Sequence, residues 1–257
     1  MNNVLEYLEN IDVNNQKGIK DLKDYISYQD LKIISKRIGT FLIRKTASRK
    51  AIPIYMEKGA KCVSLFMGSL YAGCFYTLLN TDLPAKRLKD IMNVLESDII
   101  LTDNDHLKTI KEIFPEKSIY CYEDMINSDI DLSLLSKRRE NSLSGDPVYA
   151  NFTSGSTGVP KGVLISHDNI ISFIDTFTAT FNISKNDCIG NQAPFDFDVS
   201  VKDIYSALKT GAMLVIVPKE YFSQPALLLD YLEDNKVTTL VWAVSALCLV
   251  SSFHGLN

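Results

Sequence analysis

The chain has 257 residues, of which 46% are hydrophobic and 23% charged, a composition typical of globular proteins. The formal net charge of −4 argues against a nucleic-acid-binding role or a membrane-surface role, and no apolar run reaches the roughly 18 residues that a membrane span requires. Because the five cysteines show no CxxC spacing, we expect buried thiols in a reducing cytoplasm rather than disulfides or metal ligands. The acidic, polar start carries no secretory signal.

Strand-like and helix-like segments alternate along the first 122 residues. Residues 1–26 are predicted to be helical, and Ser27 is predicted to cap a helix with an apolar stripe from Tyr28 to Leu42. Further strands are predicted at 51–56, 74–79, 98–102 and 118–122, with helices at 58–72, from 84 onward and around 106–114. This alternation predicts an α/β fold of layered, mostly parallel sheets flanked by helices.

Residues 123–146 are predicted to be a polar linker, with the basic triplet Lys137–Arg139 in a solvated loop. The linker separates a first α/β subdomain, residues 1–146, from a second one, residues 147–257.

The stretch from Tyr149 to Gly162, YANFTSGSTGVPKG, is a polar, glycine-rich loop between two apolar strands. Its glycines 155, 158 and 162 can adopt positive φ and let a ligand approach the backbone, and its hydroxyls add hydrogen-bond donors. Lys161 adds a mobile positive charge. These groups suit a polyphosphate, although the spacing is not the Walker pattern. Composition alone leaves an ordinary Gly/Ser surface loop equally open.

Two polar residues stand at predicted helix starts further along. His167 follows the predicted cap Ser166, and its type allows proton transfer, but a hydrogen-bonding role at the helix start explains it better. Asp198 lies between a strand at 189–193 and a helix, where its residue type favours an N-cap, with Asp196 as a competing cap. Strands at 213–217 and 239–243 and a helix from Pro225 follow, and Trp242 is expected in the core.

The decapeptide TSGSTGVPKG resembles the signature loop of the adenylate-forming (AMP-binding) ligase superfamily, which includes acyl-CoA synthetases and the adenylation domains of peptide synthetases. The resemblance implies ATP and Mg²⁺, with a loop that closes over the β- and γ-phosphates. It implies nucleotide contacts from Thr153, Ser154, Gly155, Ser156, Thr157, Gly158 and Lys161, with Lys161 gripping phosphate. Residues 27–31 and 73–87 are similar to other family segments, except that Leu78 or Leu79 replaces a usual proline.

The segment Phe197–Ser200, FDVS, looks like the region in which amino-acid adenylation domains and D-alanine–carrier-protein ligases pair an Asp with the substrate ammonium. The resemblance therefore implies that Asp198 and Phe197 bind substrate. A fatty acid would leave Asp198 buried without a partner, at a cost of roughly several kcal/mol.

The resemblance covers the whole chain but only the first half of the large N-terminal domain of such a ligase. Counterparts of the adenine-binding segment, the ribose-binding Asp, the hinge and the main catalytic lysine are absent, and no metal-binding residue is assigned. We expect the N-terminal portion of a ligase that makes an aminoacyl adenylate for a carrier-protein phosphopantetheine thiol, nearly inactive alone. The alternatives are an acyl-CoA synthetase-type ligase and a non-catalytic truncated or structural domain. Apolar surface at Leu240–Leu249 predicts self-association.

Overall fold

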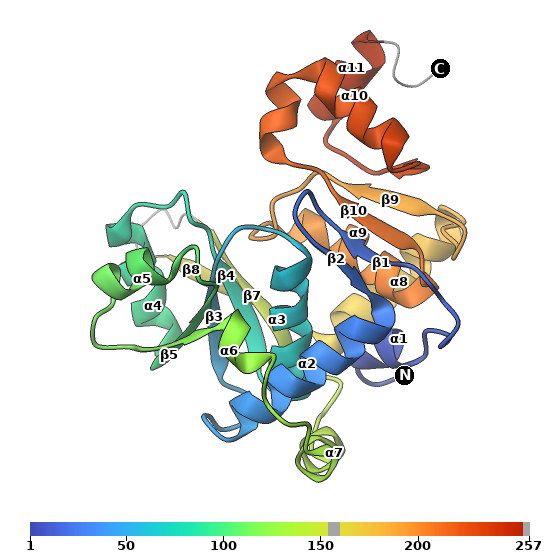
Figure 1. The fold of residues 1–257 in the computed structure, drawn as a ribbon. Helices are drawn as coiled ribbons and strands as arrows, with labels where there is room; N and C mark the ends of the chain where they lie inside the picture. Colours follow the sequence, from blue (N-terminus) through green and yellow to red (C-terminus); the bar gives the residue numbers. More distant parts are fainter. Residues whose placement is uncertain (154–159, 254–257) are drawn as a thin grey trace.

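The computed structural model describes residues 1–153 and 160–253 and shows two sheets with helices between and around them (Figure 1). The predicted α/β architecture is confirmed, because both sheets are mostly parallel and helices cover their faces. Among the described residues, no helix combines the length and the apolar character needed to cross a membrane.

The larger sheet has six strands in the order β6-β5-β3-β4-β7-β8, and only the β7–β8 pair is antiparallel. The strands are β3 (Ala51–Tyr55), β4 (Phe75–Leu79), β5 (Ile99–Thr102), β6 (Ser118–Cys121), β7 (Pro147–Thr153) and β8 (Lys161–Ser166). All five residues of β3 are buried, as expected for a central parallel strand covered on both faces. The sequence predicted each of these strands to within about two residues.

The smaller sheet has five strands in the order β11-β9-β10-β1-β2, and only the β1–β2 pair is antiparallel. The strands are β1 (Gly18–Lys20), β2 (Tyr25–Ser27), β9 (Cys188–Asn191), β10 (Met213–Ile216) and β11 (Thr239–Leu240). The predicted helix over residues 1–26 is therefore wrong beyond α1 (Leu5–Glu9). A three-residue strand has no detectable period, and β1 takes its partner from far away, with Ile19 opposite Leu214.

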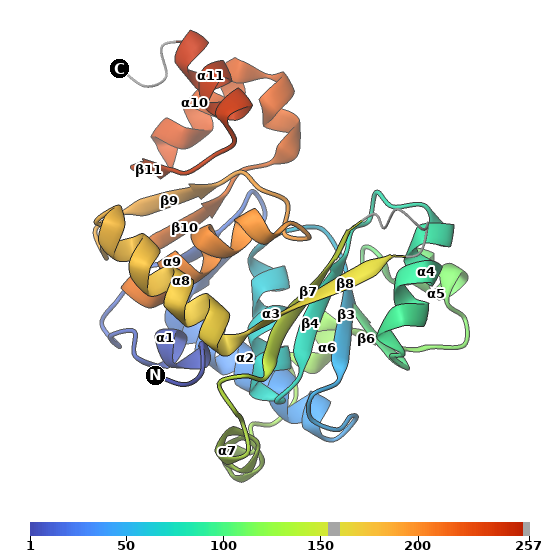
Figure 2. The ribbon, with the colours of Figure 1, turned by 180° about the vertical axis from the view of Figure 1, so that it is seen from behind.

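The helices form layers on both sheets (Figures 1 and 2). The two central helices, α2 and α3, lie between the sheets, α4 and α5 cover the outer face of the larger sheet, and α8 and α9 cover the smaller one. Their bounds are α2 (Tyr28–Ile43), α3 (Ala60–Tyr71), α4 (Ala85–Leu95), α5 (Leu107–Ile113), α8 (His167–Thr180), α9 (Val201–Thr210), α10 (Pro225–Asp234) and α11 (Val244–Ser252). The predicted caps Ser27 and Ser166 both accept a backbone hydrogen bond.

Residues 123–146 are not the predicted linker. They contain most of α6 (Tyr122–Met125) and all of α7 (Leu132–Glu140), which Asp131 caps by accepting from the Leu134 amide. The prediction failed because α7 has almost no apolar stripe. Its charged residues resemble those of a solvated loop, although Asp131 provides a helix cap. Each sheet also contains strands from both sides of residue 146. Strands β7 and β8 belong to the larger sheet, and β1 and β2 belong to the smaller one. Division into the two subdomains stays a prediction.

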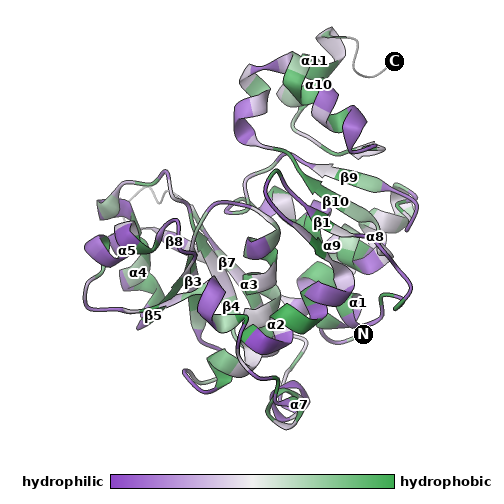
Figure 3. Cartoon of the chain, viewed as in Figure 1, coloured by the Kyte–Doolittle hydropathy of each residue, from purple (hydrophilic) through white to green (hydrophobic). Residues whose placement is uncertain are grey.

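The last part of the described chain forms its own apolar cluster against β10. Trp242 is buried there and donates from Nε1 to the Gly190 carbonyl, which confirms its core role. The predicted strand at 239–243 is shortened to two residues. Figure 3 shows the apolar character of α11, where Val244 is 76% exposed, and Cys248 is exposed rather than buried. The other four thiols are buried as predicted.

His167 has the hydrogen-bonding role that the sequence favoured. Its buried ring accepts a hydrogen bond at Nδ1 from the Val4 amide, at 3.2 Å, and so ties the entry of α1 to the start of α8. Burial lowers the pKa of His167 to about 4, and the nearby Arg139 charge acts in the same direction. The neutral imidazole is therefore the form that the fold holds.

We predict that Tyr28→Phe destabilises the chain more than Tyr25→Phe. The Tyr28 hydroxyl is fully buried and donates to the Ala212 carbonyl at 2.5 Å, which ties α2 to the start of β10. Removing the hydroxyl leaves that carbonyl without its donor and should lower the free energy of unfolding by about 1–3 kcal/mol. Tyr25 donates to the Gln16 carbonyl but is exposed, so water replaces its bond. Urea unfolding measures both variants, and equal losses would contradict the prediction.

We predict that the free energy of unfolding falls less between pH 7 and pH 4 in His167→Gln than in the wild type. The folded-state pKa of about 4 lies below the unfolded value near 6.5, so the unfolded chain binds the proton first. The stabilisation is complete above about pH 6.5 and is lost as the pH falls toward 4, by on the order of 2–3 kcal/mol. Unfolding free energies of wild type and variant, measured from pH 7 to pH 4, should converge at the acid end.

His106→Gln serves as a control of opposite sign. A hydrogen bond to Asp103 raises the pKa of His106, so its stabilisation is present below about pH 6.5 and is lost as the pH rises through the folded-state pKa. The same acid dependence in both variants would rule out the assignment to His167.

Candidate functional site

The predicted phosphate loop is carried by the β7–β8 hairpin. Thr153 and Lys161 lie opposite each other as the last pair of the antiparallel register, and both are exposed. Arg87, from the first turn of α4, donates from Nη2 to the Thr153 carbonyl at 3.2 Å. The predicted nucleotide-binding residues Ser154, Gly155, Ser156, Thr157 and Gly158 lie outside the described residues. The hairpin therefore fixes the two ends of the segment that they occupy.

Gly162 serves packing rather than a turn. Its φ is not positive, contrary to the freedom expected for it, and a Cβ at this position would lie 3.2 Å from Cζ of Phe152. A glycine lets the Phe152 ring lie across the hairpin at the first pairs of β8. The requirement for glycine at position 162 is thus explained by the Phe152 ring beside it.

The predicted substrate-binding residues Phe197 and Asp198 lie in residues 192–200, the segment that connects β9 to α9. Asp198 begins a short 3₁₀ turn, Asp198–Ser200, and caps no helix, because neither that turn nor α9 has a side-chain cap. The N-cap prediction for Asp198 is therefore wrong, and so is Asp196 as a cap, since its carboxylate accepts from Asn80 Nδ2 instead. Asp198 is exposed in this chain, not buried as expected, and Phe197 is 56% exposed.

The fold brings the 192–200 segment against the sheet that carries the phosphate loop, because Asn80, just after β4, donates from Nδ2 to Asp196 Oδ2 at 3.1 Å. The pKa of Tyr149 rises to about 12, first because its hydroxyl is desolvated and second because the negative charge of Asp198 lies nearby. Tyr149 is on β7, four residues before the hairpin opens, whereas Asp198 follows β9 of the other sheet. The Asp198 carboxylate therefore lies within electrostatic range of the strand that carries the phosphate loop.

Aromatic side chains connect the sheets beneath this point. The hydroxyls of Tyr76 on β4 and Tyr205 on α9 share a hydrogen bond of 3.0 Å, and both residues are buried. The Tyr76 ring stacks on Phe66 of α3, with ring centroids 4.0 Å apart, and on Tyr149. Phe66 also contacts Phe195 of the 192–200 segment. Packing of these rings thus contributes to placing that segment against the larger sheet.

A group of buried polar residues that was not predicted from the sequence lies at the ends of the 192–200 segment. Lys58 follows β3, Asn191 ends β9, and Asp203 lies in the first turn of α9. Burial lowers the pKa of Lys58 to about 8 and raises the pKa of Asp203 to about 6. One signal was available, because Asp203 shares a helix face with the buried residues Ser200 and Ala207 at helical spacing. A carboxylate on a buried face marks a specific polar contact.

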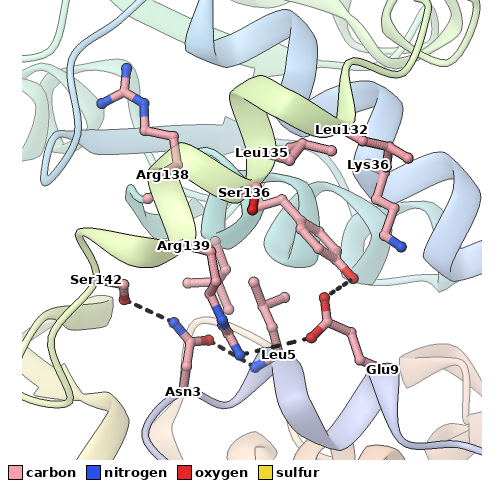
Figure 4. A pocket seen from close by; sticks show the side chains of 13 residues that line it. Asn3, Leu5, Glu9, Lys36, Leu132, Leu135, Ser136, Arg138, Arg139 and Ser142 are labelled. Carbon is pink, nitrogen blue, oxygen red and sulfur yellow. Dashed lines mark hydrogen bonds and ion pairs between the residues drawn. The ribbon is translucent and has the colours of Figure 1, made fainter.

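A cavity of about 310 Å³ lies elsewhere, between α1, α3 and α7, and two residues of the predicted basic loop, Arg138 and Arg139, line it (Figure 4). Arg139 Nη2 lies 3.4 Å from Glu6 Oε1 and 3.8 Å from Glu9 Oε2, and Arg138 donates to the Thr46 carbonyl. The loop prediction was wrong, because the triplet lies in α7, where Arg139 pairs with α1 and Arg138 bonds the chain just after α2. Since α7 precedes β7, the cavity is at the opposite end of that strand from Thr153.

Among the described residues, no group of three or more His, Cys, Asp or Glu side chains could hold a metal ion. Of the predicted site residues, only Asp198 is of one of these four types. The predicted residues place one cation, Lys161, and one carboxylate, Asp198, on segments that converge from the two sheets.

Known proteins match this chain over nearly its whole length. A D-alanine–D-alanyl carrier protein ligase of Bacillus velezensis is 33% identical over 234 residues, which are 88% of this chain and 44% of the relative. The ligase of the same name from Staphylococcus haemolyticus is 30% identical over 253 residues, which are 93% of this chain and 49% of the relative. The chain thus spans about half the length of the curated relatives that it matches.

Solved structures agree in fold. The nonribosomal peptide synthetase FmoA3, bound to α-methyl-L-serine-AMP, superposes with a TM-score of 0.87 at 19% identity, covering 99% of this chain and 28% of that one. A fatty acyl-adenylate ligase from L. pneumophila superposes with a TM-score of 0.79 at 22% identity, covering 93% and 44%. The model of the AMP-binding enzyme family matches residues 13–251, and the chain belongs to this family of adenylate-forming ligases.

Proposed function

We propose that this chain is the N-terminal portion of an ATP-dependent ligase that activates an amino acid as its adenylate and transfers it to a carrier-protein thiol. The observation that carries the proposal is the contact of the segment that bears Asp198 with the larger sheet, whose strand β7 leads into the signature loop. The names of the relatives support D-alanine as the amino acid. An acyl-CoA synthetase has no comparable support, because the fatty acyl-adenylate ligase shows a shared fold only.

The ATP side of the proposed site is the segment from Thr153 to Lys161. Its amides and hydroxyls, including those of Ser154, Gly155, Ser156, Thr157 and Gly158, would hold the β- and γ-phosphates. The substrate carboxylate attacks the α-phosphorus, the bond to the bridging oxygen breaks, and pyrophosphate leaves. Lys161, exposed at the start of β8, would stabilise the charge that develops on pyrophosphate. Mg²⁺ enters this proposal only as the ion that accompanies ATP.

The amino-acid side is Asp198, with Phe197 beside it. A carboxylate that faces an ammonium makes a charge-assisted pair, and binding would bury the pair together. Phe197 offers an exposed apolar ring that a small side chain can cover. A substrate without an amino group would bury the Asp198 charge without compensation.

The remaining partners follow from this reaction. The acceptor is the phosphopantetheine thiol of a carrier protein, and five unbridged thiols fit the reducing cytoplasm in which we place the reaction. Catalysis by this chain alone should be weak, because it spans about half of its relatives. We also propose that the chain self-associates through α11, where Val244 is exposed and Leu247 and Leu249 are only partly buried. Sedimentation can test this proposal.

We predict that D-alanine binds more tightly than propionate, and that Asp198→Asn abolishes the difference. Propionate has the same carbon skeleton without the ammonium, so the ratio of the two dissociation constants isolates the pair with Asp198. A charge-assisted bond is worth roughly 1.5–3 kcal/mol, which corresponds to a loss of about tenfold or more for D-alanine alone. Titrations in the presence of ATP, followed by NMR, measure both ligands.

Asp230→Asn is the matched control, because Asp230 is an exposed carboxylate on α10, outside the proposed site. Equal binding of D-alanine and propionate to the wild-type chain would refute the amino-acid assignment. A preference for D-alanine that survives in Asp198→Asn would move the ammonium site elsewhere.

We predict that Lys161→Met weakens ATP binding roughly tenfold while AMP binding is unchanged, because only the outer phosphates are expected to meet the lysine. Calorimetry with ATP and with AMP measures the two affinities. Lys185→Met, at an exposed loop lysine, is the control. A parallel loss for ATP and AMP would show that Lys161 supports the fold rather than the outer phosphates.

A further inference from the structure

The segment that carries Asp198 lies over a buried cluster of charged and polar side chains. Asn191 is fully buried and Asp203 is 1% exposed, and Lys58 reaches them from the larger sheet. The cluster therefore joins the end of β3, the end of β9 and the first turn of α9. The 192–200 segment begins at the end of β9 and ends at the first turn of α9, so the cluster contacts both ends of the segment.

The side-chain amide of Asn191 bridges a cation and an anion. Lys58 Nζ donates to Asn191 Oδ1 at 3.3 Å, and Asn191 Nδ2 donates to Asp203 Oδ2 at 2.9 Å. The two neighbours fix the orientation of the amide, because an ammonium only donates and a carboxylate only accepts. Lys58 Nζ also donates to the Gln192 carbonyl at 3.0 Å, which holds the first residue of the segment.

The far end of the segment is held in a similar way. Lys202 Nζ donates to the Val199 carbonyl at 2.8 Å and lies 4.0 Å from Asp203 Oδ1. In the middle, Asn80 Nδ2 donates to Asp196 Oδ2 at 3.1 Å. The backbone on both sides of Asp198 is thus held by two lysines. Lys202 contacts Asp203 directly, and Lys58 contacts the Asn191 amide that donates to Asp203.

Stability alone does not explain this cluster. Buried charges are desolvated at a cost, and apolar side chains of similar volume would commonly stabilise a core at least as well. Oδ1 of Asp203 is buried and accepts no hydrogen bond among the described residues, so the carboxylate is held at a further cost. What the charges provide, and apolar residues cannot, is a directed hold on the Gln192 and Val199 carbonyls.

We propose that Lys58 and Asp203 are positioning residues which, acting through Asn191, fix the 192–200 segment and so hold Asp198 beside β7. Both residues act on the segment through hydrogen bonds within the chain. The inference rests on the proposed function only for the identity of that ligand, since the hold on the segment is a property of the chain itself.

Amide hydrogen exchange in this chain tests the proposal directly. The amides of Phe197 and Ser200 are hydrogen-bonded to the carbonyls of Pro194 and Phe197, so they report on the order of the segment. Lys58→Met should speed their exchange about tenfold or more, because a hydrogen bond from a charged donor is lost. Amides in β4 and β10 should keep their protection, whereas a general loss of stability would speed exchange everywhere.

Lys61→Met is the matched control. Lys61 lies three residues further on, in the first turn of α3, and pairs with Asp24 at 3.4 Å, away from the segment. Its exchange pattern should match the wild type. Unchanged exchange at Phe197 and Ser200 in Lys58→Met, or the same increase in Lys61→Met, would overturn the proposal.

Asp203→Asn keeps the shape of the side chain and decides the matter if Lys58→Met does not fold. It should speed exchange at the same two amides while β4 and β10 keep their protection, and unchanged exchange at Phe197 and Ser200 would overturn the proposal. Where both single variants fold, the double variant should show less than the product of the two single effects, because both act through Asn191. Independent effects would overturn the proposal.

The affinity for D-alanine separates this inference from the proposed function. If both hold, Lys58→Met weakens binding of D-alanine about tenfold and leaves ATP binding unchanged. If the wild-type chain binds no D-alanine, the proposed function fails, and the exchange rates still decide whether Lys58 and Asp203 position the segment.

Discussion

The close contact between α2 and α3 is the constraint on which the two-sheet arrangement depends. A Cβ on Gly68 of α3 would lie 2.4 Å from Cγ2 of Ile38, and a Cβ on Gly39 of α2 would lie 2.6 Å from Cβ of Tyr71. Two glycines thus let the helix backbones approach more closely than larger side chains would allow. The pair forms one layer, with the larger sheet on one side and the smaller sheet on the other.

The position of that layer brings the two sheets together where the site residues lie. Phe66 of α3 stacks on Tyr76 of the larger sheet and also contacts Phe195, beyond β9 of the smaller sheet. The polar contacts Tyr76–Tyr205 and Lys58–Asn191 then cross between the sheets. Apolar packing sets the distance between the sheets, and the polar contacts select one register, because buried donors and acceptors must meet their partners.

The sequence predicts those elements that are specified by residues close together in the chain, and it does not predict those that depend on distant partners. Strands such as β3, and caps such as Ser27 and Ser166, are specified by neighbouring residues, and the structure confirms them. Strand β1 forms only because β10 arrives beside it, and α7 is held by ion pairs from α1, so neither has a local signature. The same distinction applies to the site. The string TSGSTGVPKG identified the family, but the polar cluster of Lys58, Asn191 and Asp203 comes from three segments far apart in sequence.

Asp198 shows how the structure changes an inference drawn from residue type. The sequence offered a helix cap or a buried carboxylate, and the structure shows an exposed side chain that caps nothing. An exposed aspartate needs no partner for the fold, so its place beside Tyr149 is not explained by stability. Its own segment, by contrast, is held by buried charges that are costly to the fold. The buried charges therefore fix the segment at a cost in folding free energy, and the exposed Asp198 carboxylate on that segment does not contribute to stability. This combination is expected where a chain presents a charge to a ligand.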